Sequence, residues 1–456
     1  MEKSKHFKEL EIILSSFSCD KGCPYCTAKI TQWETVVDDV HMLSLYVGQL
    51  KELGYTFRYV TLGGNGEPTL HSYNKIKEIV ELFDDYAGVE IKRVLTSGNV
   101  FRWDEKLKYE LFKAHGWLFE VTTTDFEFEK SGGTQNYSFD YFRTEAFRKA
   151  PVRLNYVLLK DNIDYFVDDI KKFLTTYGNI QTVALKLLNV NTKTGKVDNK
   201  YSQWIVDNAI PKTDRESIKE VLDKYFEYQG AAFDTFSWLD KETNKEIYFS
   251  WKKSEYGLYD LVYYGDRFVT YQLEDASYKL DLLPKIYIAA RFVKTKYKDG
   301  SWDLADDFRS KLIGDKKLFM NFNSHTFIKD SEGNYKYQFI GPFYNEKAST
   351  GDLTSTICEE VVRTESQLID RCDIFMVYLN DTVSPGGIAE LMYAVMQDKD
   401  IVIFYKCNSD IKYELKTENW YPITQVLQLS KKKVTVLGVK DEDEVISWFR
   451  SVGSSI

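Results

Sequence analysis

Three cysteines stand close together near the N-terminus and could hold a metal centre. Cys19, Cys23 and Cys26 follow C-x3-C-x2-C spacing in the segment SFSCDKGCPYCTA. Three thiolates can hold three irons of a 4Fe-4S cluster and leave the fourth iron open for a ligand, whereas a pure electron carrier usually supplies four cysteines. The remaining cysteines are scattered among apolar neighbours and are expected to be inert core thiols: Cys358, Cys372 and Cys407.

A structural zinc site is the alternative for the same loop. Zinc would need a fourth ligand nearby, and all histidines of the chain lie outside the loop: His6, His41, His71, His115 and His325. A disulfide framework would need evenly spread cysteines and an oxidising compartment. The clustering therefore favours an iron–sulfur site.

Short β-rich runs alternate with amphipathic stretches from residue 9 to about residue 190. This alternation is typical of βα units around a parallel sheet. It predicts an α/β fold, with a partial (β/α)6 barrel over 1–190 and the chemistry at the carboxyl ends of the strands. The expected strands are LEIILSSF, FRYVTLGG, IKRVLTS, WLFEVTTT, VRLNYVLL and TVALKLL.

Two further regions follow the expected barrel. Residues 191–283 combine a polar connection, the helical segment RESIKEVLDKYFEYQ and two or three expected antiparallel strands, and are interpreted as an accessory segment. A second βα series occupies 284–456 and predicts a small Rossmann-like or flavodoxin-like C-terminal domain.

The cysteine spacing, with Tyr25 just before the last cysteine, resembles the signature of the radical S-adenosylmethionine (SAM) superfamily. That resemblance implies a 4Fe-4S cluster on Cys19, Cys23 and Cys26, whose open iron is chelated by SAM. It also implies an electron donor of the flavodoxin or ferredoxin type and cleavage of SAM to a 5′-deoxyadenosyl radical that abstracts hydrogen from a substrate.

The segment LGGNGEPTLH resembles the Gly-Gly-Glu motif of that family, in which backbone groups and a carboxylate hold the SAM ammonium. The matching residues are Gly64, Gly66 and Glu67. Polar residues after later strands are further candidates for the ribose and adenine, although each could equally be a cap or a loop residue: Thr96, Ser97, Asn99, Thr122, Thr124 and Asn155.

Residues 284–410 resemble the nucleoside 2-deoxyribosyltransferase-like family in the segments KIYIAARF, RTESQLIDRCDIFMVYLND and SPGGIAELMYAV. The resemblance implies a nucleoside pocket with Tyr287 and Glu390 as catalytic positions, Glu390 being the nucleophile. Substrate contacts are implied for Glu365, Gly386 and Gly387. Arg291, at the end of the strand KIYIAARF, could contact a base or phosphate of the substrate or could equally form an ordinary surface pair. A helix N-terminus after SPGG favours anions, while Ser384 stands where the transferases have a second aspartate.

The two resemblances together predict a radical enzyme whose small-molecule nucleobase or nucleoside substrate is held by both domains. This domain order is similar to the queuine lyases of queuosine salvage, which convert queuine to 7-aminomethyl-7-deazaguanine. Three alternatives remain: a bifunctional enzyme with an N-glycosidase domain acting on a modified nucleoside, a domain that clears 5′-deoxyadenosine, and a non-catalytic nucleotide sensor.

Composition narrows the setting of this chemistry. The chain has 456 residues and a formal net charge of -9, which argues against broad phosphate-backbone binding. No apolar run reaches the roughly 18 to 20 residues of a membrane helix, and the N-terminus lacks a signal-peptide pattern. A cytoplasmic protein is expected, with no membrane or stable nucleic-acid partner and with a homodimer as one option.

Overall fold

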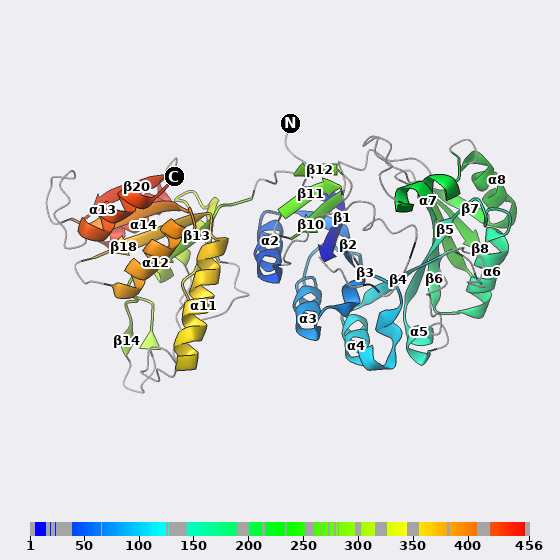
Figure 1. Cartoon of the computed structure of the whole chain (residues 1–456), viewed down its shortest axis with the longest axis horizontal. Helices are drawn as coiled ribbons and strands as arrows, with labels where there is room; N and C mark the ends of the chain where they lie inside the picture. The colour runs from blue at the N-terminus through cyan, green and yellow to red at the C-terminus, as the bar shows by residue number, and fades with distance from the viewer. Residues whose placement is uncertain are drawn as a thin grey trace. The chain divides into compact units, whose positions relative to one another are not determined.

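The computed structural model divides the chain into two compact units, Met1–Leu280 and Asp281–Ile456. Each unit has its own sheet and is described by itself (Figure 1). The residues described are 5–14, 19, 23, 39–64, 66–124, 126, 144–188, 200–211, 215–232, 235–250, 260–265, 267–271, 274–277, 280, 282–296, 302–314, 326–343, 355–380, 384–407 and 420–451. Among them, no helix is both long enough and apolar enough to cross a bilayer.

The first unit is built on six parallel strands that are neighbours in chain order. Each strand of the row pairs in parallel with the next one, as expected for repeated βα units. The α/β prediction is therefore confirmed. The strands are β1 (His6–Leu14), β2 (Thr56–Gly64), β3 (Ile91–Thr96), β4 (Trp117–Thr123), β5 (Val152–Leu158) and β6 (Ile180–Leu187).

Helices connect these strands and cover the apolar side of the sheet. In Figure 1 they follow one another around the outside of the strands. Val60 and Leu62 of β2 are fully buried, whereas the alternate positions Tyr59 and Thr61 belong to a polar inner face. The helices are α2 (Val40–Glu52), α3 (Tyr73–Glu81), α4 (Lys106–Ala114), α5 (Glu145–Lys149), α6 (Phe166–Thr176), α7 (Lys200–Asn208) and α8 (Arg215–Tyr225).

The sheet continues beyond both ends of this row. The segment 245–272 is expected to form two or three antiparallel strands, but the structure separates them. Strand β9 (Lys245–Ser250) pairs in parallel with β6, and β10 (Asp260–Tyr264) pairs in parallel with β1. Strands β8 (Thr235–Asp240) and β7 (Glu227–Ala232) follow β9, and β11 (Arg267–Tyr271) and β12 (Glu274–Ser277) follow β10. Strands β9 and β10 thereby cover the edges of β6 and β1, which would otherwise expose unpaired backbone groups.

The second unit contains a six-stranded sheet in the order β16-β17-β13-β18-β19-β20, in which β16 alone is antiparallel to its neighbour. The strands are β13 (Lys285–Ala289), β16 (Thr326–Lys329), β17 (Tyr335–Gly341), β18 (Ile374–Leu379), β19 (Asp400–Lys406) and β20 (Val434–Val439). The other elements are β14 (Thr295–Lys296), β15 (Trp302–Asp303), α9 (Phe308–Ile313), α11 (Ser355–Arg371), α12 (Pro385–Met396), α13 (Trp420–Leu429) and α14 (Glu442–Arg450).

Strand β13 lies where the chain changes direction across this second sheet. The parallel strand β17 lies on one side of β13, and the chain then crosses to β18 on the other side. In open α/β sheets such a switch point leaves a crevice beyond the carboxyl ends of the strands, where ligands commonly bind.

Candidate functional site

The cysteine segment begins at the carboxyl end of β1, beside the glycine-rich end of β2. Leu14 of β1 pairs with Gly64 of β2, and a Cβ on Gly64 would lie 3.2 Å from the Leu14 carbonyl oxygen. Glycine therefore permits the close approach of the two strand ends. Cys19 is exposed and Cys23 is half-buried, while Cys26 lies outside the described residues. Three soft thiolate donors in one segment suit iron.

Glu67 is buried and holds the ends of β2 and β3 together. One carboxylate oxygen accepts a hydrogen bond from the backbone N–H of Thr69 at 3.1 Å and another from the Thr69 hydroxyl. The other oxygen accepts from the backbone N–H of Ser97. Glu67 also caps the short helix η1 (Pro68–Leu70). This carboxylate has a structural task whether or not it also contacts a ligand, and the sequence alone did not reveal that task.

We expect Glu67→Ala to lower the free energy of unfolding by about 1 to 3 kcal/mol, because it leaves buried backbone donors without their acceptor. Urea denaturation measures the change. Glu81→Ala is the matched control: this glutamate lies on α3 and forms a half-exposed ion pair with Lys77 at 3.7 Å, which is worth about 0 to 1 kcal/mol. Equal losses in the two variants would contradict the role of Glu67.

The other polar candidates of the first unit lie at or near strand ends. Ser97 follows β3, and its buried hydroxyl lacks a hydrogen-bond partner among the described residues. Asn99 is buried at the start of η2 (Asn99–Phe101), after Gly98 with a φ of 99°. Thr122 is half-buried within β4. The remaining candidates, Thr96, Thr124 and Asn155, are buried.

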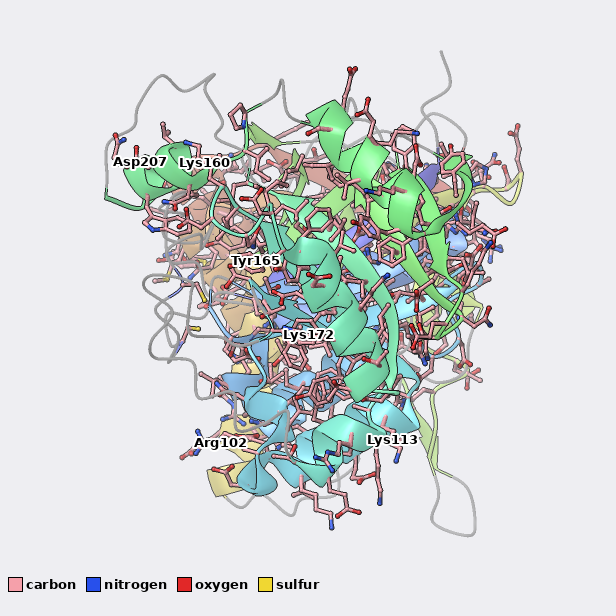
Figure 2. All side chains as sticks on the ribbon, turned by 90° about the vertical axis from the view of Figure 1, so that its right-hand side faces the viewer. Arg102, Lys113, Lys160, Tyr165, Lys172 and Asp207 are labelled. Carbon is pink, nitrogen blue, oxygen red and sulfur yellow. The ribbon has the colours of Figure 1, made fainter. Side chains whose placement is uncertain are left out.

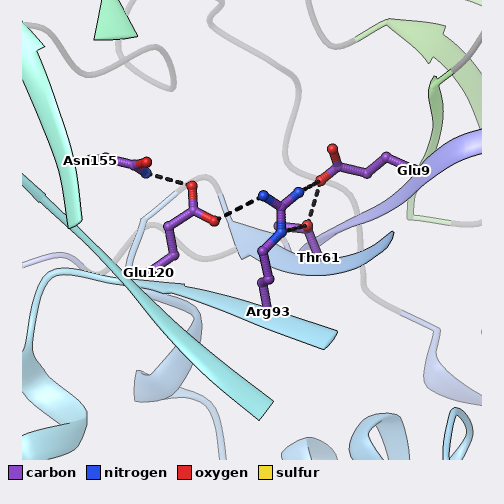
Figure 3. Close-up of polar contacts among 5 residues, drawn as sticks. All are labelled: Glu9, Thr61, Arg93, Glu120 and Asn155. Carbon is purple, nitrogen blue, oxygen red and sulfur yellow. Dashed lines mark hydrogen bonds and ion pairs between the residues drawn. The ribbon is translucent and has the colours of Figure 1, made fainter. Parts of the chain in front are cut away.

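Asn155 belongs to a chain of charged and polar contacts across the inner face of the sheet (Figure 3). Its amide nitrogen donates to a carboxylate oxygen of Glu120 at 2.6 Å. The other Glu120 oxygen lies 3.3 Å from the guanidinium of Arg93, which also forms an ion pair with Glu9 at 2.6 Å. Thr61 donates to Glu9 and accepts from Arg93. Five neighbouring strands, β1 to β5, are thereby linked by side chains.

The pKa shifts reflect the balance of burial and charge in this network. Burial opposes ionisation of Glu120, but Arg93, Arg153 and Lys186 outweigh it and lower its pKa to about 2. Burial likewise opposes ionisation of Glu9, whereas Arg93 and Thr61 lower its pKa overall. Both carboxylates are therefore charged at neutral pH.

The same interactions indicate that the sheet is strongly curved. Glu9 on β1 and Lys186 on β6 act on each other electrostatically. A flat sheet would separate these strands by five spacings of about 4.8 Å, or about 24 Å. Tyr59 on β2 and Tyr248 on β9 also interact. The polar face is thus the concave side, and its charged residues can meet there.

In the second unit, the structure brings together the three acidic and phenolic side chains that the sequence singled out. The buried hydroxyl of Tyr287, on β13, donates to Glu365 of α11 at 2.7 Å. Its ring stacks on Phe375 of β18 with a centroid distance of 5.5 Å. Glu390 of α12 lies close enough to Tyr287 for the two groups to act on each other electrostatically. All three side chains meet at the switch-point strand β13.

Both carboxyls of this cluster ionise with difficulty. Burial raises the pKa of Glu365 to about 8, with a further contribution from Glu390 and opposition from the hydrogen bond of Tyr287. Burial raises the pKa of Glu390 to about 7, against the charge of Arg309. Burial and the two glutamates also raise the pKa of Tyr287. The cluster can exchange protons near neutral pH, which suits acid–base chemistry or hydrogen bonding to a base edge.

Sequence reasoning missed a buried ion pair beside this cluster. Arg309 donates to both carboxylate oxygens of Asp307, at 2.9 and 2.8 Å, and to the carbonyl oxygen of Ile288 at 3.2 Å. Its guanidinium lies 4.0 Å from the ring centroid of Phe292. Asp307 and Arg309 are two residues apart in the sequence. This spacing is equally compatible with an exposed helix N-cap, so the sequence does not reveal that the pair is buried.

The predicted glycines lie in the first turn of α12, and Arg291 lies just after β13. Ser384 caps α12, and its hydroxyl accepts from the backbone N–H of Gly387 at 3.4 Å. Gly387 is buried and Gly386 is exposed. Arg291 is exposed two residues after the end of β13. Nothing in these contacts joins Arg291 to the Tyr287 cluster.

Gly341 is a further position that the sequence did not identify. It has a φ of 147°, and a Cβ there would lie 2.9 Å from the Leu368 side chain and 3.2 Å from the Tyr287 ring. Glycine is required at this position because a side chain would displace the ring that carries the hydroxyl.

Comparisons with known proteins give distant similarities only. No protein-family model matches the chain, and no curated protein matches it. The Clostridium botulinum CMP N-glycosidase BcmB shares 20% identity over 20% of this chain and 71% of its own, with a TM-score of 0.16. The structure of anSMEcpe with bound AdoMet and Cp18Cys peptide shares 16% identity over 48% of this chain, with a TM-score of 0.35.

Coproporphyrinogen III oxidase (HemN) from Escherichia coli, described as a radical SAM enzyme, shares 13% identity over 50% of this chain, with a TM-score of 0.32. The chain spans 59% of anSMEcpe and 55% of HemN.

Proposed function

We propose that the first unit is a radical SAM enzyme with a 4Fe-4S cluster on Cys19, Cys23 and Cys26. The observation that carries this proposal is the pairing of Leu14 with Gly64. Leu14 ends the strand that precedes the three-cysteine segment in the sequence, and Gly64 ends the glycine-rich strand beside it, within a row of six parallel strands. Such a partial (β/α)6 barrel would concentrate its chemistry at the carboxyl ends of the strands.

The chain's own residues would have separate tasks in this reaction. When bound, the cluster supplies the electron that cleaves SAM and so generates a hydrogen-abstracting radical. The carboxylate oxygens of Glu67 already accept hydrogen bonds from the chain, and they could accept a further one from the SAM ammonium. Gly64 and Gly66 would allow the backbone to approach SAM closely. Ser97, Asn99, Thr122 and Asn155 are the candidates for the ribose and adenine. The fold must also hold one substrate C–H bond and exclude water.

The second unit supports a substrate that contains a nucleobase. Tyr287, Glu365 and Glu390 present one phenol and two carboxyls at a switch point, where donors and acceptors of a purine-like edge could be matched. We propose conversion of queuine to 7-aminomethyl-7-deazaguanine as the reaction to test. Hydrogen abstraction from the cyclopentenediol would weaken its bond to the exocyclic nitrogen. A flavodoxin or ferredoxin would supply the electron.

The decisive experiment is an anaerobic assay with dithionite, SAM and each of queuine, its nucleoside and ordinary purine nucleosides, with products identified by mass. We expect 5′-deoxyadenosine together with 7-aminomethyl-7-deazaguanine from queuine, and neither product without SAM. Glu390→Ala should weaken substrate binding while uncoupled SAM cleavage survives. Glu360→Ala, at an exposed position of α11, is the control. Failure of every base and nucleoside to bind would refute a nucleobase substrate.

An N-glycosidase activity of the second unit is the second candidate. The raised pKa of Glu390, about 7, beside the Tyr287 hydroxyl favours it, because such a group can exchange a proton near neutral pH. Release of free base from a modified nucleoside or from 5′-deoxyadenosine without added SAM, abolished by Glu390→Gln, would support this candidate.

A further inference from the structure

Two positively charged side chains on the concave face of the first sheet are not neutralised by a direct ion pair. Arg153 of β5 and Lys186 of β6 belong to the same face, because Arg153 pairs with Thr182 and Lys186 lies four residues farther along β6. Neither side chain forms an ion pair with any residue in the described part of the chain. Both still act electrostatically on Glu120 over a longer distance. Lys186 keeps an exposed side chain.

Hydrogen-bonding capacity is also left over at this place. The Nε of Arg153 is buried without an acceptor among the described residues, although its guanidinium lies 6.0 Å from the Tyr248 ring centroid. Asn155 is only 5% exposed, and its amide oxygen is buried without a donor. Its nitrogen is already engaged by Glu120. One buried donor, the Nε of Arg153, thus lacks an acceptor, while two nearby buried acceptors, the Oδ1 of Asn155 and the Oε2 of Glu120, lack a hydrogen-bond donor among the described residues.

The two glutamates of this face form ion pairs with Arg93 and none with Arg153 or Lys186 among the described residues, although the Oε2 of Glu120 keeps free hydrogen-bonding capacity. Glu9 and Glu120 both pair with Arg93, at 2.6 and 3.3 Å. One guanidinium therefore already serves both carboxylates, and Glu120 in addition accepts from Asn155. Buried polar groups generally find partners in a working protein. An unsatisfied set of this kind indicates a ligand that brings an anionic group with a hydrogen-bond donor beside it.

We propose that Lys186 and Arg153 bind a phosphate or carboxylate group of a ligand whose adjacent hydroxyl donates to Asn155. A sugar phosphate and a hydroxy acid share this chemistry. The assignment of this ligand as the substrate rests on the proposed radical SAM function of the first unit. Queuine carries neither a phosphate nor a carboxylate, so tight binding of either anion at this site would favour an anionic nucleotide over queuine as the substrate.

The electrostatics of Lys186 agree with this geometry. Desolvation by the surrounding protein lowers the pKa of Lys186 even though the residue keeps solvent-accessible surface, Glu120 opposes that effect, and Arg153 and Arg93 lower the pKa further. A bound anion would counter the repulsion among these cations and raise the pKa of Lys186. Binding should therefore weaken as the pH rises through the pKa of Lys186, which lies below that of an ordinary lysine.

Calorimetry on the anaerobically reconstituted full-length protein tests the proposal with three probes: ribose 5-phosphate, glycerate and ribose. We expect one or both anions to bind at least tenfold more tightly than ribose, and the preferred anion identifies phosphate or carboxylate as the source. Lys186→Met should weaken that binding at least tenfold, and Asn155→Asp should weaken it by repulsion. Lys172→Met, on the outer helix α6 (Figure 2), is the matched control and should change nothing.

Several results would overturn the inference. Absence of binding by both anions would do so, as would equal binding by ribose or anion binding unaffected by Lys186→Met. A parallel loss of SAM affinity in Lys186→Met would assign the cations to the cofactor. Because the probes need no SAM cleavage, anion binding by a protein that cannot cleave SAM would refute the proposed function and leave this site standing.

Discussion

Replacing any one of Cys19, Cys23 and Cys26 with Ala is expected to remove both the iron and the cleavage of SAM. Each cysteine would supply one of only three protein ligands, so no substitute thiolate remains to hold the cluster. Iron and sulfide content after anaerobic reconstitution and the yield of 5′-deoxyadenosine measure the effect.

Cys372→Ala is the control for this experiment, because Cys372 is buried in the second unit and burial raises its pKa to about 12. It should leave iron content and SAM cleavage unchanged. Stoichiometric zinc without iron in the reconstituted wild-type protein would end the radical SAM interpretation and restore the zinc alternative.

Arg93→Met is expected to destabilise the first unit by about 3 to 5 kcal/mol at pH 7, since removing one partner of a buried ion pair leaves uncompensated charge. Arg93 is 6% exposed and serves both Glu9 and Glu120. Methionine keeps much of the side-chain volume, so the loss reports mainly on charge. Urea denaturation measures it.

The pH dependence separates this electrostatic effect from poor packing. In the wild-type protein the pKa of Glu120 is lowered to about 2. Its ionisation therefore contributes stability above its ordinary pKa of 4.5, and acidification toward pH 2 removes that contribution. Without Arg93, the contribution at pH 7 is reduced, so the gap between the two proteins should narrow as the pH falls.

Arg58→Met is the matched control for Arg93→Met. The Arg58 side chain pairs with Glu90 at 2.6 Å, but the two side chains are 49% and 57% exposed. Such a pair is worth about 0 to 1 kcal/mol. A constant gap between wild type and Arg93→Met across the pH range would instead point to packing.

The first six strands of the first unit were predictable because each buries alternate residues between charged helices. The row from LEIILSSF to TVALKLL corresponds to β1 through β6 in order. The partners of β9 and β10 were not predictable, since an alternating pattern indicates a strand without naming its neighbour. The fully buried Phe249 and Leu261 look alike in sequence, yet their strands extend opposite ends of the sheet.

The candidate sites also differ in whether the sequence predicted them. Tyr287, Glu365 and Glu390 were recognised together because short motifs around them resemble a known family, and the structure brings them into contact. The Glu9–Arg93–Glu120 network was missed. Its members are 84 and 27 positions apart, and Glu9 and Arg93 stand beside other charged residues in their strands, so the sequence does not single them out. Only the register of neighbouring parallel strands reveals that Arg93 lies between the two carboxylates.

The parallel pairing of β1 with β10 has a consequence for synthesis of the chain. Leu10 of β1 pairs with Leu261 of β10. At about 5 to 20 residues per second, the ribosome would need about 12 to 50 seconds to reach β10 after finishing β1. During that interval one edge of β1 has no native partner, and a nascent chain with an open edge can pair with another chain. The charges of Lys8, Glu9 and Glu11 on β1 would oppose such association until its last neighbour emerges.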